Sequence, residues 1–246
     1  MGEALVPSSA RGGARGRYPR CMAVAIVADA HLGGPGGPAE PLVEQLRALP
    51  GQGILRLVLL GDLCQVWVGY PQYETPEVRA VLAAVAELRA SGLRVDYVEG
   101  NRDFFLAEGV YRSRFDSIGA EVAFEAAGVR YLAVHGDGLN DRDRQYLAWR
   151  WLSKSAAVRG VVRHLPKRIV APLVHGTERR LSGTNFKHKA VVPEAAIRRY
   201  AEGRLAQGHD VLLLGHFHEP FSWRVAGGEV RLLDAWFRSR RIERLG

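Results

Sequence analysis

Five short blocks along the chain contain side chains that bind divalent metal ions. A mixed set of carboxylate, amide and imidazole groups suits Mn²⁺, Fe²⁺ or Zn²⁺ better than Mg²⁺ or Ca²⁺, which prefer shells made only of oxygen. Two such ions roughly 3.5–4 Å apart polarise a phosphoryl group and activate water for in-line displacement. The residue types therefore indicate metal-assisted chemistry at phosphorus. The blocks are Asp29-Ala30-His31, Gly61-Asp62, Gly100-Asn101-Arg102-Asp103, His135-Gly136-Asp137 and Gly215-His216-Phe217-His218.

Each block directly follows an apolar run that has the length of a buried strand. In α/β sheets, ligands bind at the carboxyl ends of strands, so side chains that follow several strands are expected to converge. A carboxylate between two ions would bind both, and Asp62 is placed for that role. The seven expected metal ligands are Asp29, His31, Asp62, Asn101, His135, His216 and His218.

Each of these residues, taken singly, also has a purely structural explanation. An aspartate such as Asp62 after a strand often caps a turn. Asn101 after a glycine suits a left-handed turn position, and a single histidine such as His135 is most often a hydrogen-bonded core residue. The ordered occurrence of all five blocks after apolar strands favours the metal site over these separate explanations.

The remaining pattern predicts alternating strands and helices, followed by a β-rich end. A helix is expected to begin after Thr75, with Pro76 just inside it, and to stop at Gly92. Gly128 is expected to turn one hairpin and Gly227-Gly228 to turn the last. Residues 140–206 have a helical pattern. Strands are expected at 22–28, 54–60, 93–98, 121–126, 130–134, 210–214, 221–226 and 229–236.

Length and composition limit the class of protein. The chain has 246 residues, of which 47% are hydrophobic and 24% charged, as in an ordinary globular protein. None of its apolar runs reaches the ~18 residues of a membrane span, and 2 cysteines are too few for a disulfide framework. Residues 1–20 contain arginine, proline and glycine without an apolar stretch, so we expect a flexible basic leader rather than a secretory signal, with Met22 as an alternative start.

The net charge of +8 is concentrated in one part of the chain. Residues 144–204 carry 14 Lys or Arg and only 3 Asp or Glu, whereas the segment before them is acidic. A basic region of this size indicates a partner that carries phosphates, which could be a nucleic acid, a nucleotide or an anionic membrane. We therefore expect one domain over residues 21–246 that carries a basic helical insertion at about 144–204.

The five blocks resemble the signature motifs of calcineurin-like metallophosphoesterases, and the resemblance extends from about residue 23 to residue 236. It implies an α/β sandwich of two facing β-sheets flanked by helices. It also implies two metal sites that share one ligand. Asp29, His31, Asp62 and His218 would hold one ion, and Asp62, Asn101, His135 and His216 would hold the other.

Within this superfamily, the chain resembles the UDP-2,3-diacylglucosamine hydrolase family. The segment 61–69, the block at 101–104, and Asp143 and Tyr146 before a long helical insertion carry the likeness. The resemblance implies cleavage of the pyrophosphate of UDP-2,3-diacylglucosamine to 2,3-diacylglucosamine 1-phosphate and UMP, in lipid A biosynthesis. It further implies two Mn²⁺ ions and a peripheral location on the cytoplasmic face of the inner membrane, with no nucleic acid and no obligate protein partner.

The resemblance also assigns roles to individual residues. Asn101, Arg102 and His135 form the expected catalytic set, in which Asn101 holds the phosphate and Arg102 offsets developing negative charge. His216 and Asp143 are expected to contact substrate. The polar contacts of the family's lid have no clean match, and their spacing is shifted here. The nearest candidates for these lid contacts are Ser182, Asn185, Lys187 and Lys189.

Two questions stay open at the level of sequence. Val161, Leu165 and Ile169 alternate with cations, which suits a lid that takes up acyl chains on an anionic membrane, but equally suits helices that pack on the core. The enzyme could also be a nuclease or a dinucleoside polyphosphate hydrolase, although the aliphatic insertion offers few aromatic platforms for bases. A non-catalytic scaffold of the same fold is the third alternative, and the complete ligand set argues against it.

Overall fold

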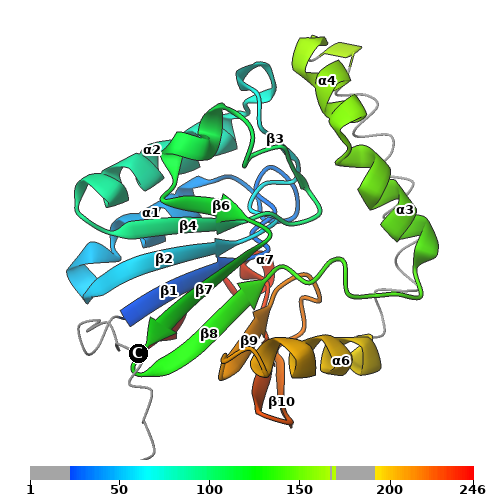
Figure 1. Cartoon of the computed structure of the whole chain (residues 1–246). Coiled ribbons are helices and arrows are strands. Elements are labelled where there is room, and N and C mark those ends of the chain that lie inside the picture. Colours follow the sequence, from blue (N-terminus) through cyan, green and yellow to red (C-terminus); the bar gives the residue numbers. More distant parts are fainter. Residues whose placement is uncertain (1–22, 167, 170–191) are drawn as a thin grey trace, which may run out of the picture.

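The computed structural model describes residues 23–166, 168–169 and 192–246, and in it two five-stranded sheets face each other (Figure 1). The first sheet has the order β12-β1-β2-β4-β6, and all of its neighbours are parallel except β12 and β1. This sheet carries the first three blocks of the expected site. Its strands are β1 (Ala23–Ala28), β2 (Ile54–Leu60), β4 (Arg94–Val98), β6 (Ser117–Gly119) and β12 (Glu243–Leu245).

The second sheet has the order β10-β11-β9-β8-β7, with a parallel centre and an antiparallel hairpin at each side. A separate parallel pair, β3 (Trp67–Val68) and β5 (Asp103–Phe104), joins the loops that follow β2 and β4. The strands of the second sheet are β7 (Glu121–Ala126), β8 (Val129–Val134), β9 (Val211–Leu214), β10 (Phe221–Val225) and β11 (Gly228–Leu232).

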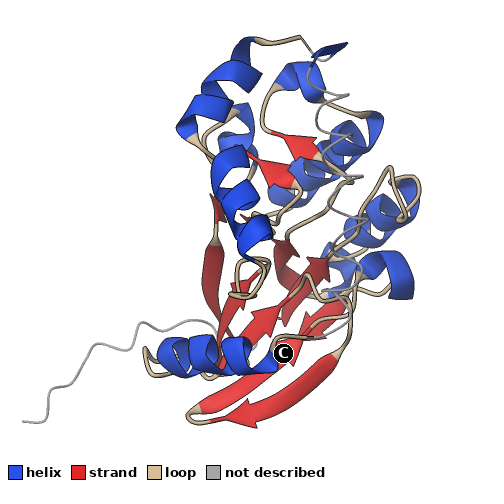
Figure 2. Ribbon diagram, turned by 90° about the vertical axis from the view of Figure 1, so that its right-hand side faces the viewer, coloured by secondary structure: helices blue, strands red, loops and turns tan. Residues whose placement is uncertain are grey.

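Helices cover the outer faces of both sheets, as the view in Figure 2 also shows. Helices α1 (Glu40–Arg47) and α2 (Pro76–Ala90) pack on the first sheet, and α6 (Glu194–Leu205) packs on the second. The expected sandwich of two facing sheets flanked by helices is confirmed. Short 3₁₀ turns occur at Pro50–Gln52, Pro71–Tyr73 and Val110–Arg114.

Alternation along β1 shows how the sequence produces these layers. Val24 and Ile26 are buried between the two sheets, whereas Ala25 and Val27 are buried against the helices. A strand that is buried on both faces reads as a continuous apolar run, which is typical of a parallel sheet covered on both sides. This is why β1 and β2 were recognisable in the sequence as short, uninterrupted apolar segments.

Helices α3 (Arg144–Ser153) and α4 (Ala156–His164) form an arm that extends along the side of the sandwich (Figure 1). Val162 is the buried residue of α4, and it packs in a small cluster with Val68, Tyr73 and Phe105. The hydroxyl of Tyr73 lies 2.8 Å from the carbonyl oxygen of Val162, which holds α4 to the body. In the part of the chain that the structure describes, none of the helices is long and apolar enough to cross a membrane.

Most expected elements are present, but the last hairpin differs from its prediction in two ways. Its turn lies at Ala226-Gly227 rather than Gly227-Gly228, because Gly228 already pairs with Val225. The helix α2 begins after Thr75, whose side chain accepts a hydrogen bond from the backbone N–H of Val78, as the sequence predicts. The last strand, however, ends at Leu232 rather than continuing to Trp236, which starts the short helix α7 (Trp236–Ser239). The reason is that the Trp236 indole is buried on the helix side of the first sheet and donates a hydrogen bond to Gln45. The expected leader at 1–20 lies outside the described residues.

Candidate metal centre

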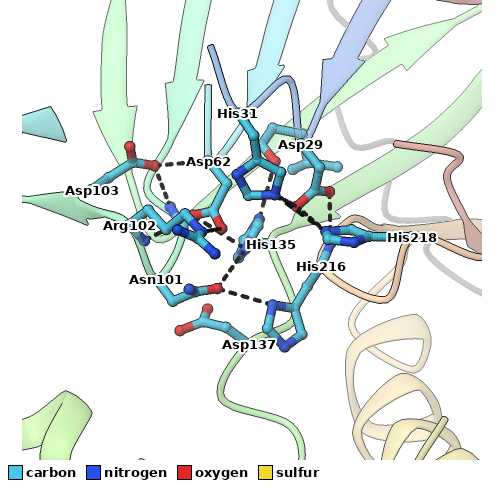
Figure 3. A network of polar contacts seen from close by, with 12 residues as sticks. Asp29, His31, Asp62, Asn101, Arg102, Asp103, His135, Asp137, His216 and His218 are labelled. Atoms are coloured by element: carbon cyan, nitrogen blue, oxygen red, sulfur yellow. Dashed lines mark hydrogen bonds and ion pairs between the residues drawn. The ribbon is translucent and has the colours of Figure 1, made fainter. Parts of the chain in front are cut away.

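The five blocks meet at one edge of the sandwich, where strands of both sheets end (Figure 3). Asp29, Asp62 and Asn101 follow β1, β2 and β4 of the first sheet, whereas His135 and His216 follow β8 and β9 of the second. The site is therefore built by both sheets together. The carboxylate of Asp29 links them, because its Oδ2 accepts a hydrogen bond from the backbone N–H of His216 at 2.8 Å.

One group of side chains has the spacing of ligands around a single ion. The Nε2 atoms of His31 and His218 are 3.4 Å apart, and Asp29 Oδ1 lies 3.8 Å from His31 Nε2 and 3.2 Å from His218 Nε2. Ligands about 2.1 Å from one ion in a tetrahedral arrangement lie roughly 3.4 Å apart. These three residues could therefore hold a metal ion without rearranging.

A second group lies beside the first and shares a residue with it. Asp29, Asp62 and His135 also bring ligand atoms within 4.8 Å of one another, and all three are buried. Asn101 Oδ1 lies 3.3 Å from His135 Nε2 and 2.9 Å from His216 Nδ1, so the amide and both imidazoles point to one place. The structure thus brings all seven expected ligands together, and the carboxylate that the two groups have in common is that of Asp29.

The electrostatics of the centre favour bound cations. Although burial acts to raise them, the pKa values of Asp29 and Asp62 are lowered by the surrounding histidines, so both carboxyls are charged. Burial lowers the pKa of His31 to about 4, which leaves the neutral imidazole that binds metals. Although burial opposes this shift, the charges of Asp62 and Asp29 raise the pKa of His135, so the pocket attracts positive charge.

The backbone at the centre is held in an unusual conformation. Only a few per cent of non-glycine residues have a positive φ, and strained residues of this kind cluster at functional sites. The same loops come unusually close together, because a Cβ on Gly100 would clash with Asp62 Oδ1. Positive φ angles occur at five expected ligands, namely Asp29 (50°), His31 (47°), Asp62 (51°), His216 (66°) and His218 (59°).

Comparison with curated proteins identifies the family to which the chain belongs. The chain is 30% identical over 228 residues to a UDP-2,3-diacylglucosamine hydrolase of Ralstonia nicotianae, an alignment that covers 87% of this chain and 83% of that protein. The chain belongs to the UDP-2,3-diacylglucosamine hydrolase family. The protein of the same name from Enterobacter sp. is 29% identical and covered to 91% of its length. The family expected from the sequence is thereby confirmed, and its members are named as hydrolases.

Other comparisons are more distant. A solution NMR structure of a Thermotoga maritima protein is 15% identical, with a TM-score of 0.46 and coverage of 92% of this chain and 91% of that one. An archaeal phosphodiesterase is 11% identical, with a TM-score of 0.42 and coverage of 91% and 99%. The search of protein-family models gave no match.

In this member of the UDP-2,3-diacylglucosamine hydrolase family, Arg102 lies beside the carboxylate of Asp62. Its backbone N–H donates to Asp62 Oδ1 at 2.8 Å, and its Nε lies 3.5 Å from Asp62 Oδ2. Its side chain is largely buried and also donates to the carbonyl oxygen of Gln65. The guanidinium is therefore held beside Asp62.

Asp103 holds two ligand loops together, a role that the sequence did not reveal. One of its oxygens, Oδ2, accepts hydrogen bonds from the backbone N–H groups of Asp62 at 3.0 Å and Gly100 at 2.7 Å. Burial and the nearby Asp62 charge raise the pKa of Asp103 to about 7. The residue was visible in the sequence as part of the Asn-Arg-Asp block, but its contacts depend on how the loops fold.

Three further hydrogen bonds tie the arm to the centre. Asp137, two residues after His135, is buried and accepts hydrogen bonds from the Tyr146 hydroxyl at 2.9 Å and from Arg150 Nε at 2.5 Å. The ammonium of Lys154 donates to the carbonyl oxygen of Gly100 at 2.7 Å. The sequence placed both cations in the basic insertion, but nothing in it distinguished them from the other Lys and Arg residues there.

The remaining expected site residues have different outcomes. Asp143 is the N-terminal cap of α3, where its side chain accepts a hydrogen bond from the backbone N–H of Tyr146 at 2.9 Å. This contact explains its place at the start of the arm. The expected lid contacts Ser182, Asn185, Lys187 and Lys189 lie outside the described residues.

Proposed function

We propose that this protein hydrolyses the pyrophosphate bond of UDP-2,3-diacylglucosamine to give 2,3-diacylglucosamine 1-phosphate and UMP, in lipid A biosynthesis. The observation that carries the proposal is the pair of ligand groups that share the buried carboxylate of Asp29, in a chain whose relatives are named for this reaction. The donor set of carboxylate, amide and imidazole fits two divalent ions, and we propose Mn²⁺.

The ions are assigned as follows. Asp29, His31, Asp62 and His218 would hold the first, and Asp62, Asn101, His135 and His216 would hold the second. When bound, such a pair supplies Lewis acidity toward a phosphoryl oxygen and activates water at neutral pH. The residues of the chain orient the substrate around them.

The neighbouring residues have three tasks in this mechanism. The Asn101 amide and His216 position the phosphoryl group, and the Arg102 guanidinium stabilises the negative charge that develops as the pyrophosphate bond breaks. His135 remains buried, and its Nδ1 lies 3.1 Å from the carbonyl oxygen of Leu60, which fixes the orientation of the ring.

We further propose that the arm of α3 and α4 meets the lipid part of the substrate and an anionic membrane, on the cytoplasmic face of the inner membrane. Trp151 of α3 is 76% exposed and Val161 of α4 is more than half exposed, as is Ile169 just beyond α4, among several arginines. Exposed apolar side chains set among cations suit an anionic bilayer surface. Leu165, in contrast, packs partly against the body with Val162, so the arm has one face for the core and one for a ligand.

The test is a direct assay of the purified full chain with Mn²⁺. UMP release from UDP-2,3-diacylglucosamine is compared with release from UDP-N-acetylglucosamine and with hydrolysis of a DNA oligonucleotide. We expect metal-dependent cleavage of the lipid substrate at a rate at least 100-fold above both comparisons. Preferential cleavage of DNA, or UMP release at equal rates from both UDP sugars, would contradict the proposal.

A further inference from the structure

Lys154 occupies an unusual place for a residue of the basic arm. It follows the last turn of α3, and its ammonium donates to the carbonyl oxygen of Gly100, the residue just before Asn101. The ring of Phe104 lies 6.0 Å from the same nitrogen, which screens it on one side. The ammonium is therefore held at the edge of the metal centre, although its backbone belongs to the insertion.

The ammonium of Lys154 has more donors than its contact with Gly100 uses. An ammonium has three N–H donors, and within the described residues Gly100 is the partner to which the structure shows it donating. The other donors can serve an anion bound in front of Asn101.

Two cations thus flank Asn101 from different parts of the fold. Arg102 approaches from the body beside Asp62, and Lys154 approaches from α3 beside Gly100. Negatively charged oxygens bind most strongly where charged donors converge on them from fixed positions. A phosphoryl group at Asn101 would lie between these two cations.

We propose that Lys154 is a phosphate-binding residue of the active site, delivered by the arm. This proposal rests on the proposed function, because it assumes that the centre binds phosphoryl groups. If Lys154 binds phosphate, the position of its ammonium in the active site depends on the docking of α3. The contact of Arg150 with Asp137 anchors the same helix, so α3 keeps an attachment when Lys154 is changed.

The experiment measures binding of inorganic phosphate to the Mn²⁺-loaded full chain by calorimetry. The variants are Lys154→Gln, Lys154→Met and Lys154→Arg. The matched control is Arg159→Gln, which removes the same charge from α4, where Arg159 pairs with the exposed Glu108. We expect Lys154→Gln and Lys154→Met to weaken phosphate binding at least 10-fold, Lys154→Arg to keep most of the affinity, and Arg159→Gln to change it less than 2-fold.

Metal content and melting temperature are measured in each variant. Phosphate affinity within 2-fold of wild type in Lys154→Gln would overturn the proposal, and so would an equal loss in Arg159→Gln. Loss of Mn²⁺ together with a lower melting temperature in all three Lys154 variants would show a structural role instead. Phosphate binding is measured separately from cleavage of the UDP lipid. A failure to cleave that lipid would therefore contradict the proposed function, while the effect of Lys154 on phosphate affinity could still be interpreted.

Discussion

Replacing Asp103 by alanine removes a buried carboxyl group, one oxygen of which accepts two hydrogen bonds. The backbone N–H groups of Asp62 and Gly100 both donate to Asp103 Oδ2, and the side chain is fully buried. A buried donor left without a partner costs about 1–3 kcal/mol. Two such donors predict that Asp103→Ala lowers the free energy of unfolding by about 2–6 kcal/mol. The loops that carry Asp62 and Asn101 also lose their shared attachment, so Mn²⁺ affinity should fall at least 10-fold.

Asparagine supplies the matched control for this prediction. Since both hydrogen bonds end on the same oxygen, an amide oxygen at that position can accept both. Asp103→Asn should therefore retain most of the stability and most of the Mn²⁺ affinity. Stability is measured by urea unfolding in EDTA, which separates it from metal binding, and affinity is measured by calorimetry. Equal losses of stability in the alanine and asparagine variants would refute the argument, because the hydrogen bonds would then not be its cause.

Three further predictions concern the centre, the arm and the surface. Asp62→Ala should abolish UMP release and lower the bound Mn²⁺ measured by elemental analysis; two full equivalents in an inactive variant would exclude a bridging role. Val161→Asp should raise KM for the lipid substrate at least 10-fold with an unchanged melting temperature. Val162→Asp should destabilise the protein by several kcal/mol, because Val162 is buried. Equal effects of the two changes on stability would contradict an arm with one face for the core and one for a ligand. Hydrogen bonds from Arg130 lower the pKa of Asp210 to about 2, so its small contribution to stability is present above about pH 4 and is lost as the pH falls toward 2. The stability difference between wild type and Asp210→Asn should accordingly be measurable at pH 6 and vanish near pH 2, and a difference that persists there would disprove the linkage.

The sequence predicts the convergence of the candidate ligands because its signal is local. Asp29, Asp62 and Asn101 each follow an apolar strand, and the edge of a parallel sheet brings such positions together whatever the details of the loops. The same reasoning places β1 and β2, which are buried on both faces. The family resemblance then assigns each ligand to one of two ions, an assignment that the sequence spacing alone does not give.

The features that the sequence did not reveal depend on long-range docking. Lys154 is one of many cations in the arm, and only the packing of α3 places it at the Gly100 carbonyl. Trp236 has the pattern of a strand end because apolar residues precede it. Its indole is instead buried on the helix side of the first sheet, so the chain leaves the strand before Trp236. The short β12 strand pairs with β1 at the sheet edge, and three residues give too little pattern to predict.

The left-handed backbone of the ligand residues links the supply of metal to the amount of folded protein. Five ligand residues with positive φ angles each carry a conformational cost of about 1–3 kcal/mol, and Asp29 and Asp62 add the repulsion of two buried charges. A newly synthesised chain must bear these costs until cations bind, and binding to the folded state alone shifts the folding equilibrium toward it. Scarcity of metal in the cell should therefore reduce the abundance of the protein, through proteolysis of unloaded chains, as well as its turnover.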